Sequence, residues 1–270
     1  MCLGSLAKHS RDPVRFRFHD DGTLTDEDRE QLFGQLPVHS FVSRKEANVI
    51  VKERLSLYPY CAQFRRRYIY GLKLFDAPLL AVGDDLAFCD TDILFLRPFS
   101  HLFAWPDEDT GCLFMQDYQN AYAFRPWHLA LQRKLKMPQK LNCGLFYFRK
   151  QHYDLDFIEW LLALYHKLFA VRHHWVEQTC WGALALNGNG HFWSEEQVRV
   201  IRGESCLTED LIAAHFVTPV RGLLTMAAAR DHSDCEPLPF LTEPMRRLNS
   251  FQLFQEQSRQ FVQRKMGRLS

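Results

Sequence analysis

An apolar segment over residues 86–96, interrupted by two acids, constrains most strongly how this chain can fold. It reads Leu-Ala-Phe-Cys, then Asp90, a threonine and Asp92, then Ile-Leu-Phe-Leu, and an Arg-Pro pair follows it. A short apolar run bounded by charged residues and proline predicts a buried strand. Open α/β sheets place their ligands at the carboxyl ends of such strands, and oxygen ligands there can hold a divalent cation. The segment therefore predicts a cation site at the edge of a sheet.

The Asp-x-Asp spacing alone is weak evidence, because the chain contains it three more times. Those pairs lie at 26/28, 107/109 and 154/156, and none of them is inside an apolar run. The first and last are typical of the acidic first turn of a helix. An alternative interpretation of Asp90 and Asp92 is a pair of solvated carboxylates at the end of a strand.

The composition limits the class of protein. At 270 residues and 47% hydrophobic content, the chain can bury the core of one ordinary domain. Its 33 basic and 32 acidic residues nearly cancel, so no nucleic-acid partner is expected. It has no apolar run long enough to span a membrane, and its start lacks the layout of a signal peptide. The eight scattered cysteines favour a reduced, cytoplasmic protein over a disulfide scaffold or a zinc site.

Strand-like and helix-like segments alternate along most of the chain. Strands are predicted over 14–18, 86–96, 112–115 and 144–148, and helices from Thr25 and over 43–55, 58–75, 154–169 and 175–186. This alternation is typical of an α/β fold with a largely parallel sheet flanked by helices.

The C-terminal part differs from the rest in charge. After a domain over 1–235 and a linker over 236–244, the spacing predicts a basic amphipathic helix within 245–270, with six Arg or Lys residues and one acid. Such a helix can lie on an anionic membrane, which predicts peripheral membrane contact. The alternative, a helix docked on its own domain with a solvated basic face, is the more common arrangement.

A segment near the N-terminus resembles the opening motif of haloacid-dehalogenase-type phosphatases. In Phe-His-Asp-Asp-Gly-Thr, His19 stands in the position of the nucleophile and Asp21 in that of the acid. Without a carboxylate at the first position, an aspartyl-phosphate cannot form. A phosphatase-like hydrolase is therefore a minor alternative, and a strand-ending turn at 20–22 is the better interpretation.

The order of motifs from about residue 15 to 221 resembles GT-A nucleotide-sugar glycosyltransferases, most closely glycosyltransferase family eight. Asp90 and Asp92 match the Asp-x-Asp motif of that family, and an Arg-Pro-Phe ending follows. The resemblance implies that Asp90 contacts the ribose and a metal ion, and that Asp92 is the principal metal ligand. Lys73 falls where the family keeps a basic residue that faces the donor.

Two further motifs match in the expected order. Asn142 and Gly144 precede a strand as the family's Asn-small-Gly does, which implies that the asparagine reaches the donor sugar while the glycine lets backbone approach closely. Glu177 and Gln178 resemble the acidic-Gln pair under the sugar ring, with Glu177 one methylene longer than the usual Asp. The resemblance implies a catalytic role for both.

The last motif implies a cofactor and a reaction. His215 begins a His-aromatic segment, in which the histidine would be the third metal ligand, and Arg221 takes the place of the diphosphate-binding base. The resemblance thus implies Mn²⁺ or Mg²⁺ bound by Asp90, Asp92 and His215. It implies a hexosyltransferase-like enzyme that moves a sugar, with retention, from a UDP-sugar to an acceptor hydroxyl, and the acceptor is not readable from the sequence.

Two departures from the family pattern support a competing hypothesis. The family begins with a strand before the helix that residues 3–7 resemble, so the first strand is expected to be missing, and Thr218 stands where glycine is usual. These departures favour a catalytically inactive sugar-nucleotide-binding or scaffold protein. Retention of both Asp90 and Asp92 favours the enzyme, because an inactive relative has no need of the acid pair.

Overall fold

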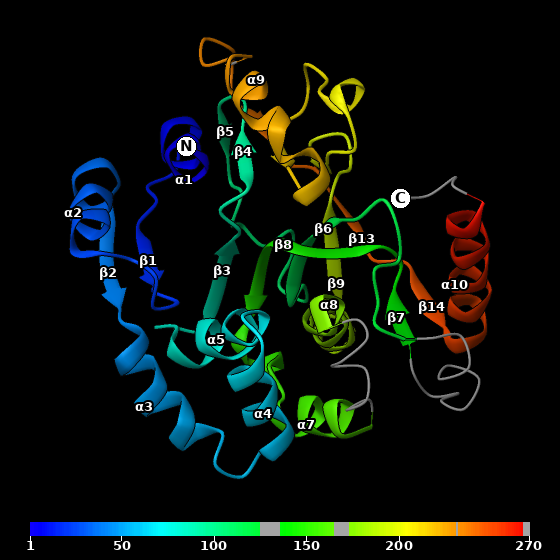
Figure 1. Cartoon of the computed structure of the whole chain (residues 1–270). Helices are drawn as coiled ribbons and strands as arrows, with labels where there is room; N and C mark the ends of the chain where they lie inside the picture. The colour runs from blue at the N-terminus through cyan, green and yellow to red at the C-terminus, as the bar shows by residue number, and fades with distance from the viewer. Residues whose placement is uncertain (125–135, 165–172, 231, 267–270) are drawn as a thin grey trace.

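The computed structural model describes residues 1–124, 136–164, 173–230 and 232–266, with an eight-stranded mixed sheet at its centre (Figure 1). The central strands are β3 (Asp85–Cys89), β4 (Ile93–Phe95), β6 (Cys112–Gln116), β8 (Leu141–Arg149), β9 (Gly190–Trp193), β10 (Val198–Val200), β11 (Ala213–His215) and β13 (Thr242–Pro244). Two-stranded sheets pair β1 (Phe16–His19) with β2 (Val38–Val42), β5 (Phe99–Ser100) with β12 (Leu238–Pro239), and β7 (Lys136–Pro138) with β14 (Arg247–Asn249).

Helices surround the central sheet. The α-helices are α1 (Cys2–His9), α2 (Asp26–Gln35), α3 (Arg44–Arg54), α4 (Pro59–Arg67), α5 (Ala77–Leu80), α7 (Leu155–Leu164), α8 (His173–Leu184), α9 (Leu224–Ala228) and α10 (Ser250–Lys265). A π-helical turn, η1 (Leu72–Asp76), and the 3₁₀ turns η2 (Lys150–His152), η4 (Glu204–Cys206) and η5 (Thr218–Leu223) complete the described helical segments. The predicted helices over 43–55 and 175–186 are confirmed apart from their ends, and the last part of the one predicted over 154–169 lies outside the described residues.

The central sheet is mixed, without the predicted excess of parallel strands. In the described residues three of its pairs are parallel and four are antiparallel, and β8 is antiparallel to both of its neighbours, β3 and β6. The prediction failed because β8 has both faces buried. A strand buried on both faces has a nearly continuous apolar run whatever its direction.

Hydrophobic clusters pack on both faces of the sheet. Leu113 of β6 and Leu145 of β8 belong to one cluster, whereas their neighbours Phe114 and Phe146 belong to another. Successive strand residues point to opposite faces, so these two clusters lie on opposite sides of the sheet. Leu6 of α1 packs in the first cluster, and residues of η1, α5 and α8 pack in the second.

The segment 86–96, predicted as one strand, is divided at its two acids. β3 pairs with β8, whereas β4 pairs with β11. Between them, the backbone N–H of Asp90 donates to the carbonyl of Gly144 at 2.7 Å, and the N–H of Phe216 donates to the carbonyl of Asp92 at 2.9 Å. A chain that changes partner must bend, and here the bend places both acids beside β8 and β11.

The helix predicted over 58–75 is also divided. α4 ends at Arg67, where Tyr68 takes an extended conformation, and the π-helical turn η1 follows. A Cβ atom on Gly71 would lie 2.4 Å from the Cα atom of Arg65, so only glycine allows this close return of the chain. The turn then presents Lys73, and π-helical turns are frequent at functional sites.

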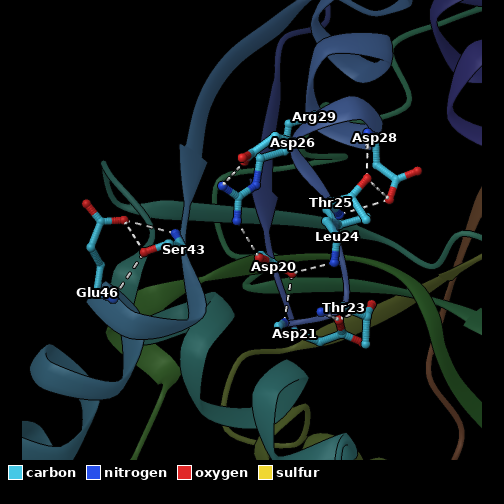
Figure 2. A network of polar contacts seen from close by, with 11 residues as sticks. Asp20, Asp21, Thr23, Leu24, Thr25, Asp26, Asp28, Arg29, Ser43 and Glu46 are labelled. Atoms are coloured by element: carbon cyan, nitrogen blue, oxygen red, sulfur yellow. Dashed lines mark hydrogen bonds and ion pairs between the residues drawn. The ribbon is translucent and has the colours of Figure 1, made fainter.

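Figure 2 shows the turn that ends β1, which the sequence predicted at 20–22. One carboxylate oxygen of Asp20 accepts from the backbone N–H groups of Gly22 at 2.7 Å and Leu24 at 3.3 Å. The other oxygen pairs with Arg29 at 3.0 Å. Gly22 has φ +97°, which favours glycine. The carboxylate of Asp20 therefore holds the turn together.

Two capping boxes start α2 and α3 (Figure 2). The Thr25 hydroxyl accepts from the backbone of Asp28 while the Asp28 carboxylate accepts from the backbone of Thr25. Ser43 and Glu46 repeat the arrangement. Each box satisfies backbone donors that a helix start otherwise leaves without partners.

The C-terminal segment is built into the domain. Residues 236–244, expected as a linker, contribute β12 and β13, and the helix expected from residue 245 begins at Ser250 after β14. Leu253 of α10 is fully buried, and Gln139 donates to the Glu256 carboxylate at 3.0 Å. The helix therefore docks on its own domain, the alternative that the sequence left open. No described helix is long and apolar enough to cross a membrane.

Candidate metal centre

Asp90, Asp92 and His215 come together although the histidine lies far away in the sequence. β11 runs antiparallel to β4, and its register places His215 opposite Ile93. One ligand atom from each of the three side chains lies within 4.8 Å of the other two. Carboxylate oxygens and an imidazole nitrogen can together bind Mg²⁺, Mn²⁺ or another first-row divalent ion. The bend between β3 and β4 thus forms a set of donors suited to a cation.

Asp92 is held by two basic groups from the far end of the chain. Its carboxylate oxygens lie 3.2 Å from Nε2 of His215 and 2.6 Å from Nη2 of Arg221, which is on η5. Burial alone would raise the pKa of Asp92, but these hydrogen bonds and charges outweigh it and lower the pKa to about 2. Asp92 therefore stays ionised, as a metal ligand must.

Lys73 of η1 lies between two acids. Its Nζ is 2.9 Å and 3.1 Å from the two carboxylate oxygens of Asp90 and 3.8 Å from Oε1 of Glu177 on α8. Burial would lower the pKa of Lys73, but the negative charges of these acids outweigh it and raise the pKa. Burial raises the pKa of Glu177 to about 7, although Lys73 opposes the shift. Glu177 is therefore a carboxyl group that titrates near neutral pH.

Asn142 of β8 orients the histidine. Its Oδ1 lies 3.2 Å from Nδ1 of His215 and accepts from the backbone N–H of Gly144 at 2.8 Å, and its Nδ2 donates to Asp117 at 3.0 Å. Because Oδ1 of Asn142 is an acceptor, it favours a proton on Nδ1 and leaves Nε2, which lies beside Asp92, as the ring nitrogen that could bind a cation. Metal-binding histidines commonly have such an outer hydrogen bond, which fixes the ring.

Gly144 allows the imidazole to approach the strand. A Cβ atom at this position would lie 2.5 Å from Cε1 of His215 and 3.0 Å from Oδ1 of Asn142. Real side chains do not tolerate such contacts, so any larger residue would displace the ring or the amide. The sequence predicted that backbone approaches closely at Gly144. In the structure, the group that approaches it is the side chain of His215.

The other predicted residue of α8, Gln178, is also buried. Its amide donates to the carbonyl of Ala121 at 3.1 Å, and its oxygen is 3.7 Å from Sγ of Cys143. Cys143 lies 3.2 Å from Oε2 of Glu177, which joins Gln178 to the rest of the site. Every site residue predicted from the sequence thus belongs to one continuous set of contacts, while their functional roles stay predictions.

Sequence reasoning missed Asp117 and Cys143. Asp117 directly follows β6, and burial raises its pKa even though Asn142 donates to it. An acid at the end of a predicted strand was the signal that could have revealed it. Nothing in the sequence marks Cys143 as a site residue, because a cysteine beside an apolar strand is typical of a buried core position.

The charges of the centre are balanced. Asp90 is paired with Lys73 and Asp92 with Arg221, so two negative and two positive groups cancel. A divalent cation added alone would leave an excess of positive charge. A cation together with a diphosphate restores the balance, because the phosphate oxygens can also pair with the lysine and the arginine.

Comparisons with known proteins bear on the fold. No protein-family model matches the chain, and no curated protein is similar in sequence. Among solved structures, mouse xyloside xylosyltransferase 1 in its apo form is similar, with a TM-score of 0.52 and 12% sequence identity. The similarity covers 81% of this chain and 91% of that one. The chain therefore has a glycosyltransferase-like α/β fold.

Proposed function

We propose that this protein is a metal-dependent glycosyltransferase that moves a sugar from a nucleotide-diphosphate sugar to an acceptor hydroxyl. The observation that supports this most is the convergence of Asp90, Asp92 and His215 within 4.8 Å, with Lys73 and Arg221 on the two acids. The glycosyltransferase-like fold supports the same reaction class.

The metal centre would act on the leaving group. Mn²⁺ or Mg²⁺ held by Asp90, Asp92 and His215 would supply electrostatic stabilisation of the departing diphosphate. Arg221 would leave Asp92 in part and pair with phosphate oxygens, and Lys73 would add its positive charge while it stays on Asp90. The exposed guanidinium of Arg221, 57% accessible, is free to move in this way, whereas the 13% accessible Lys73 is held in place.

Glu177 and Gln178 would act on the sugar side. With a pKa near 7, the carboxyl group of Glu177 can accept a hydrogen bond when ionised and donate one when protonated. One of its oxygens, Oε1, is buried without a hydrogen-bond partner among the described residues, so a sugar hydroxyl could provide one. We propose that Glu177 orients the donor sugar, with Gln178 behind it as support.

The proposal extends to the identity of the sugar donor and to the stereochemistry of the transfer. Resemblance to family eight supports a UDP-sugar, transfer of a hexose and retention of configuration. The structural neighbour is a xylosyltransferase, which supports a pentose instead. Release of UDP from UDP-glucose, UDP-galactose and UDP-xylose would rank these donors, and the anomeric NMR signal of the product would establish the stereochemistry.

A second candidate function is an inactive sugar-nucleotide-binding or scaffold protein. The ion pairs of Lys73 with Asp90 and of Arg221 with Asp92 favour it, because both carboxylates already have partners without a cation. Such a protein would bind a nucleotide diphosphate but release no sugar from any donor, so binding and turnover distinguish the two functions.

Calorimetry of UDP binding tests the proposal. We expect UDP to bind in the presence of Mn²⁺ and to lose about two orders of magnitude in affinity in EDTA or in the Asp92→Asn variant. The matched control is Asp109→Asn, which changes an exposed Asp-x-Asp pair outside any strand and should bind as the wild type does. A folded wild-type chain that binds UDP equally well with EDTA would contradict the metal centre.

A further inference from the structure

The C-terminal helix α10 lies at the edge of the fold and carries apolar side chains on two sides (Figure 1). Its inner side packs on the domain through Leu253 and Gln257, which are both buried. Its outer side carries Phe251, Phe261 and Val262, whose side chains are 66%, 52% and 54% exposed. Docking on its own domain requires one apolar side of a helix, so it does not account for the outer one.

Most of the outer positions form one strip along the helix. The exposed residues follow one another at intervals of three or four, at Phe251, Gln255, Arg259, Val262 and Met266. Residues at this spacing lie above one another on the surface of a helix. The backbone N–H of Met266 donates to the carbonyl of Val262 at 3.0 Å, so the strip extends one residue beyond the helix. An apolar residue thus stands at each end of the strip.

The exposed charges around this strip are basic. Arg259 and Lys265 are exposed on α10, and Arg246 and Arg247 are exposed just before it. Nζ of Lys265 lies 5.9 Å from the ring centre of Phe261, so a cation stands beside an exposed apolar ring. The described part of α10 therefore combines positive charge with apolar surface.

The one acid of residues 245–266, Glu256, is engaged with the domain. Its carboxylate accepts from the side chain of Gln139 at 3.0 Å and from the side chain of Asn120. The neighbouring Gln257 donates to the carbonyl of Asn120 at 3.3 Å. These contacts hold the inner side of α10 in place, and the outer side is left to the basic residues.

Helix α3 shows that this combination is not general in the molecule. It also exposes an apolar residue, Val49, but two exposed acids, Glu46 and Glu53, stand among its basic residues. Mixed charges of this kind are typical of a surface that faces water. The outer side of α10 instead has the composition of a helix that lies in a membrane interface.

Both features of the strip fit a lipid surface with negative charge. Acidic headgroups attract lysine and arginine, and the boundary between headgroups and acyl chains accepts apolar side chains. A nucleic-acid backbone would pair with the charges alone and would leave the apolar residues in water. The apolar residues therefore favour a membrane over a soluble polyanion.

We propose that the outer side of α10 docks on an anionic lipid membrane. The strip from Phe251 to Met266 lies at the boundary of headgroups and acyl chains, and Arg259 and Lys265 extend to the headgroups, as long basic side chains do there. Leu253 faces the other way, so the helix stays on its domain and the folded chain rests on the membrane surface. This inference does not depend on the proposed sugar transfer.

Flotation of the full chain with lipid vesicles tests the proposal. One set of vesicles contains phosphatidylcholine alone, and the other contains phosphatidylcholine and phosphatidylserine in equal parts. We expect the protein to float with the second set and to stay behind with the first. Flotation should decrease at about 1 M salt, where the Debye length falls to about 3 Å.

Charge reversal on the helix measures the electrostatic part. Each basic residue near an anionic surface adds about fivefold in affinity, so Arg259→Glu combined with Lys265→Glu should weaken vesicle binding by about 25-fold or more. The matched control combines Lys45→Glu with Lys52→Glu, two exposed lysines of α3, and should bind vesicles much as the wild type does.

Removal of apolar side chains measures the other part. Phe251→Ser combined with Val262→Ser should weaken vesicle binding by about tenfold or more. Its control combines Val49→Ser with Ile50→Ser, which are exposed on α3, and should bind as the wild type does. Because the substituted side chains are exposed, thermal unfolding should show that these proteins stay folded.

Four results would overturn the proposal. They are no flotation with phosphatidylserine, equal flotation with phosphatidylcholine alone, binding that survives the charge reversal, or binding that survives removal of the apolar side chains. The last result would mean that charge alone acts, and would assign the outer side of α10 to a soluble polyanion such as a nucleic acid.

Discussion

The metal centre at the end of β3 and the β1–β2 pair differ in how completely their groups are paired. At the centre, Asp90 is paired with Lys73, and Asp92 contacts both His215 and Arg221. At β1, two strand edges and His19 face a cavity without partners in the described residues. The site is thus held by its own side chains, whereas the neighbouring region leaves polar groups without partners among the described residues.

Substitutions in the two regions should therefore affect different properties of the protein. Changes at the metal centre should alter ligand binding and the pH dependence of stability, because charges there are buried and coupled. Changes in the β1–β2 region should alter stability while leaving the binding of a cation and nucleotide unchanged. The predictions below test this difference, from the largest expected effect to the smallest.

The largest effect is expected from Glu177→Gln in metal-free protein. The folded-state pKa of Glu177 is about 7, raised from 4.5, so between these values the folded state keeps a proton that the unfolded state has released. The wild type therefore loses stability as pH rises through this window, and glutamine avoids the loss. The variant should gain roughly 3 kcal/mol over the wild type between pH 4 and pH 8, measured by urea unfolding. A constant difference between the two proteins across this range would exclude a buried, neutral Glu177.

Asn142→Ala should weaken Mn²⁺ binding in the presence of UDP by about 10- to 100-fold, as loss of an outer hydrogen bond to a metal ligand does. The physical reason is the lost contact between Oδ1 of Asn142 and Nδ1 of His215. Mn²⁺ electron paramagnetic resonance measures the free ion directly. The control Asn249→Ala changes an exposed asparagine before α10 and should leave affinity unchanged. Equal affinities in both variants would mean that Asn142 does not position the histidine.

Gly144→Ala should lower the free energy of unfolding by about 1–3 kcal/mol and weaken Mn²⁺ binding, because the new methyl group overlaps the His215 ring. Gly203→Ala is its control, since a Cβ atom there meets no atom within 4 Å. Thermal unfolding with and without Mn²⁺ and UDP measures both effects. A Gly144→Ala protein as stable as Gly203→Ala, and stabilised equally by the ligands, would show that this close contact does not occur.

Ser43→Ala should have the smallest effect, a loss of about 1 kcal/mol in stability from the capping box of α3. The box follows β2 and is remote from the acids, so Mn²⁺-dependent UDP binding should not change. Chemical unfolding and calorimetry on the same preparation test both statements. A loss of UDP affinity in Ser43→Ala would remove the distinction between the two regions.

Much of the candidate site could be predicted from the sequence, because local motifs carry it. The acids at 90 and 92 interrupt an apolar run, and Asn142 and Gly144 sit just before another. That His215 meets Asp92 depends on the pairing of β11 with β4, which no local pattern reveals. Resemblance to a family supplied this long-range information, and the structure brings the same residues together.

The parts of the fold that could not be predicted are those set by long-range pairing. Buried strands have similar apolar runs in either direction, so the antiparallel position of β8 left no trace in the sequence. The division of the helix at Tyr68 depends on the close packing of Gly71 against Arg65. The unpaired edges of β1 and β3 depend on which strands come to lie beside them, which only the assembled sheet determines.

Anomalous diffraction from a crystal grown with Mn²⁺ and UDP is the measurement that tests the metal centre most directly. The predicted result is a manganese peak in contact with Asp90, Asp92, Nε2 of His215 and the two phosphates, with Arg221 moved from Asp92 to a phosphate oxygen. UDP bound without manganese, or manganese bound elsewhere while both ion pairs stay closed, would contradict it.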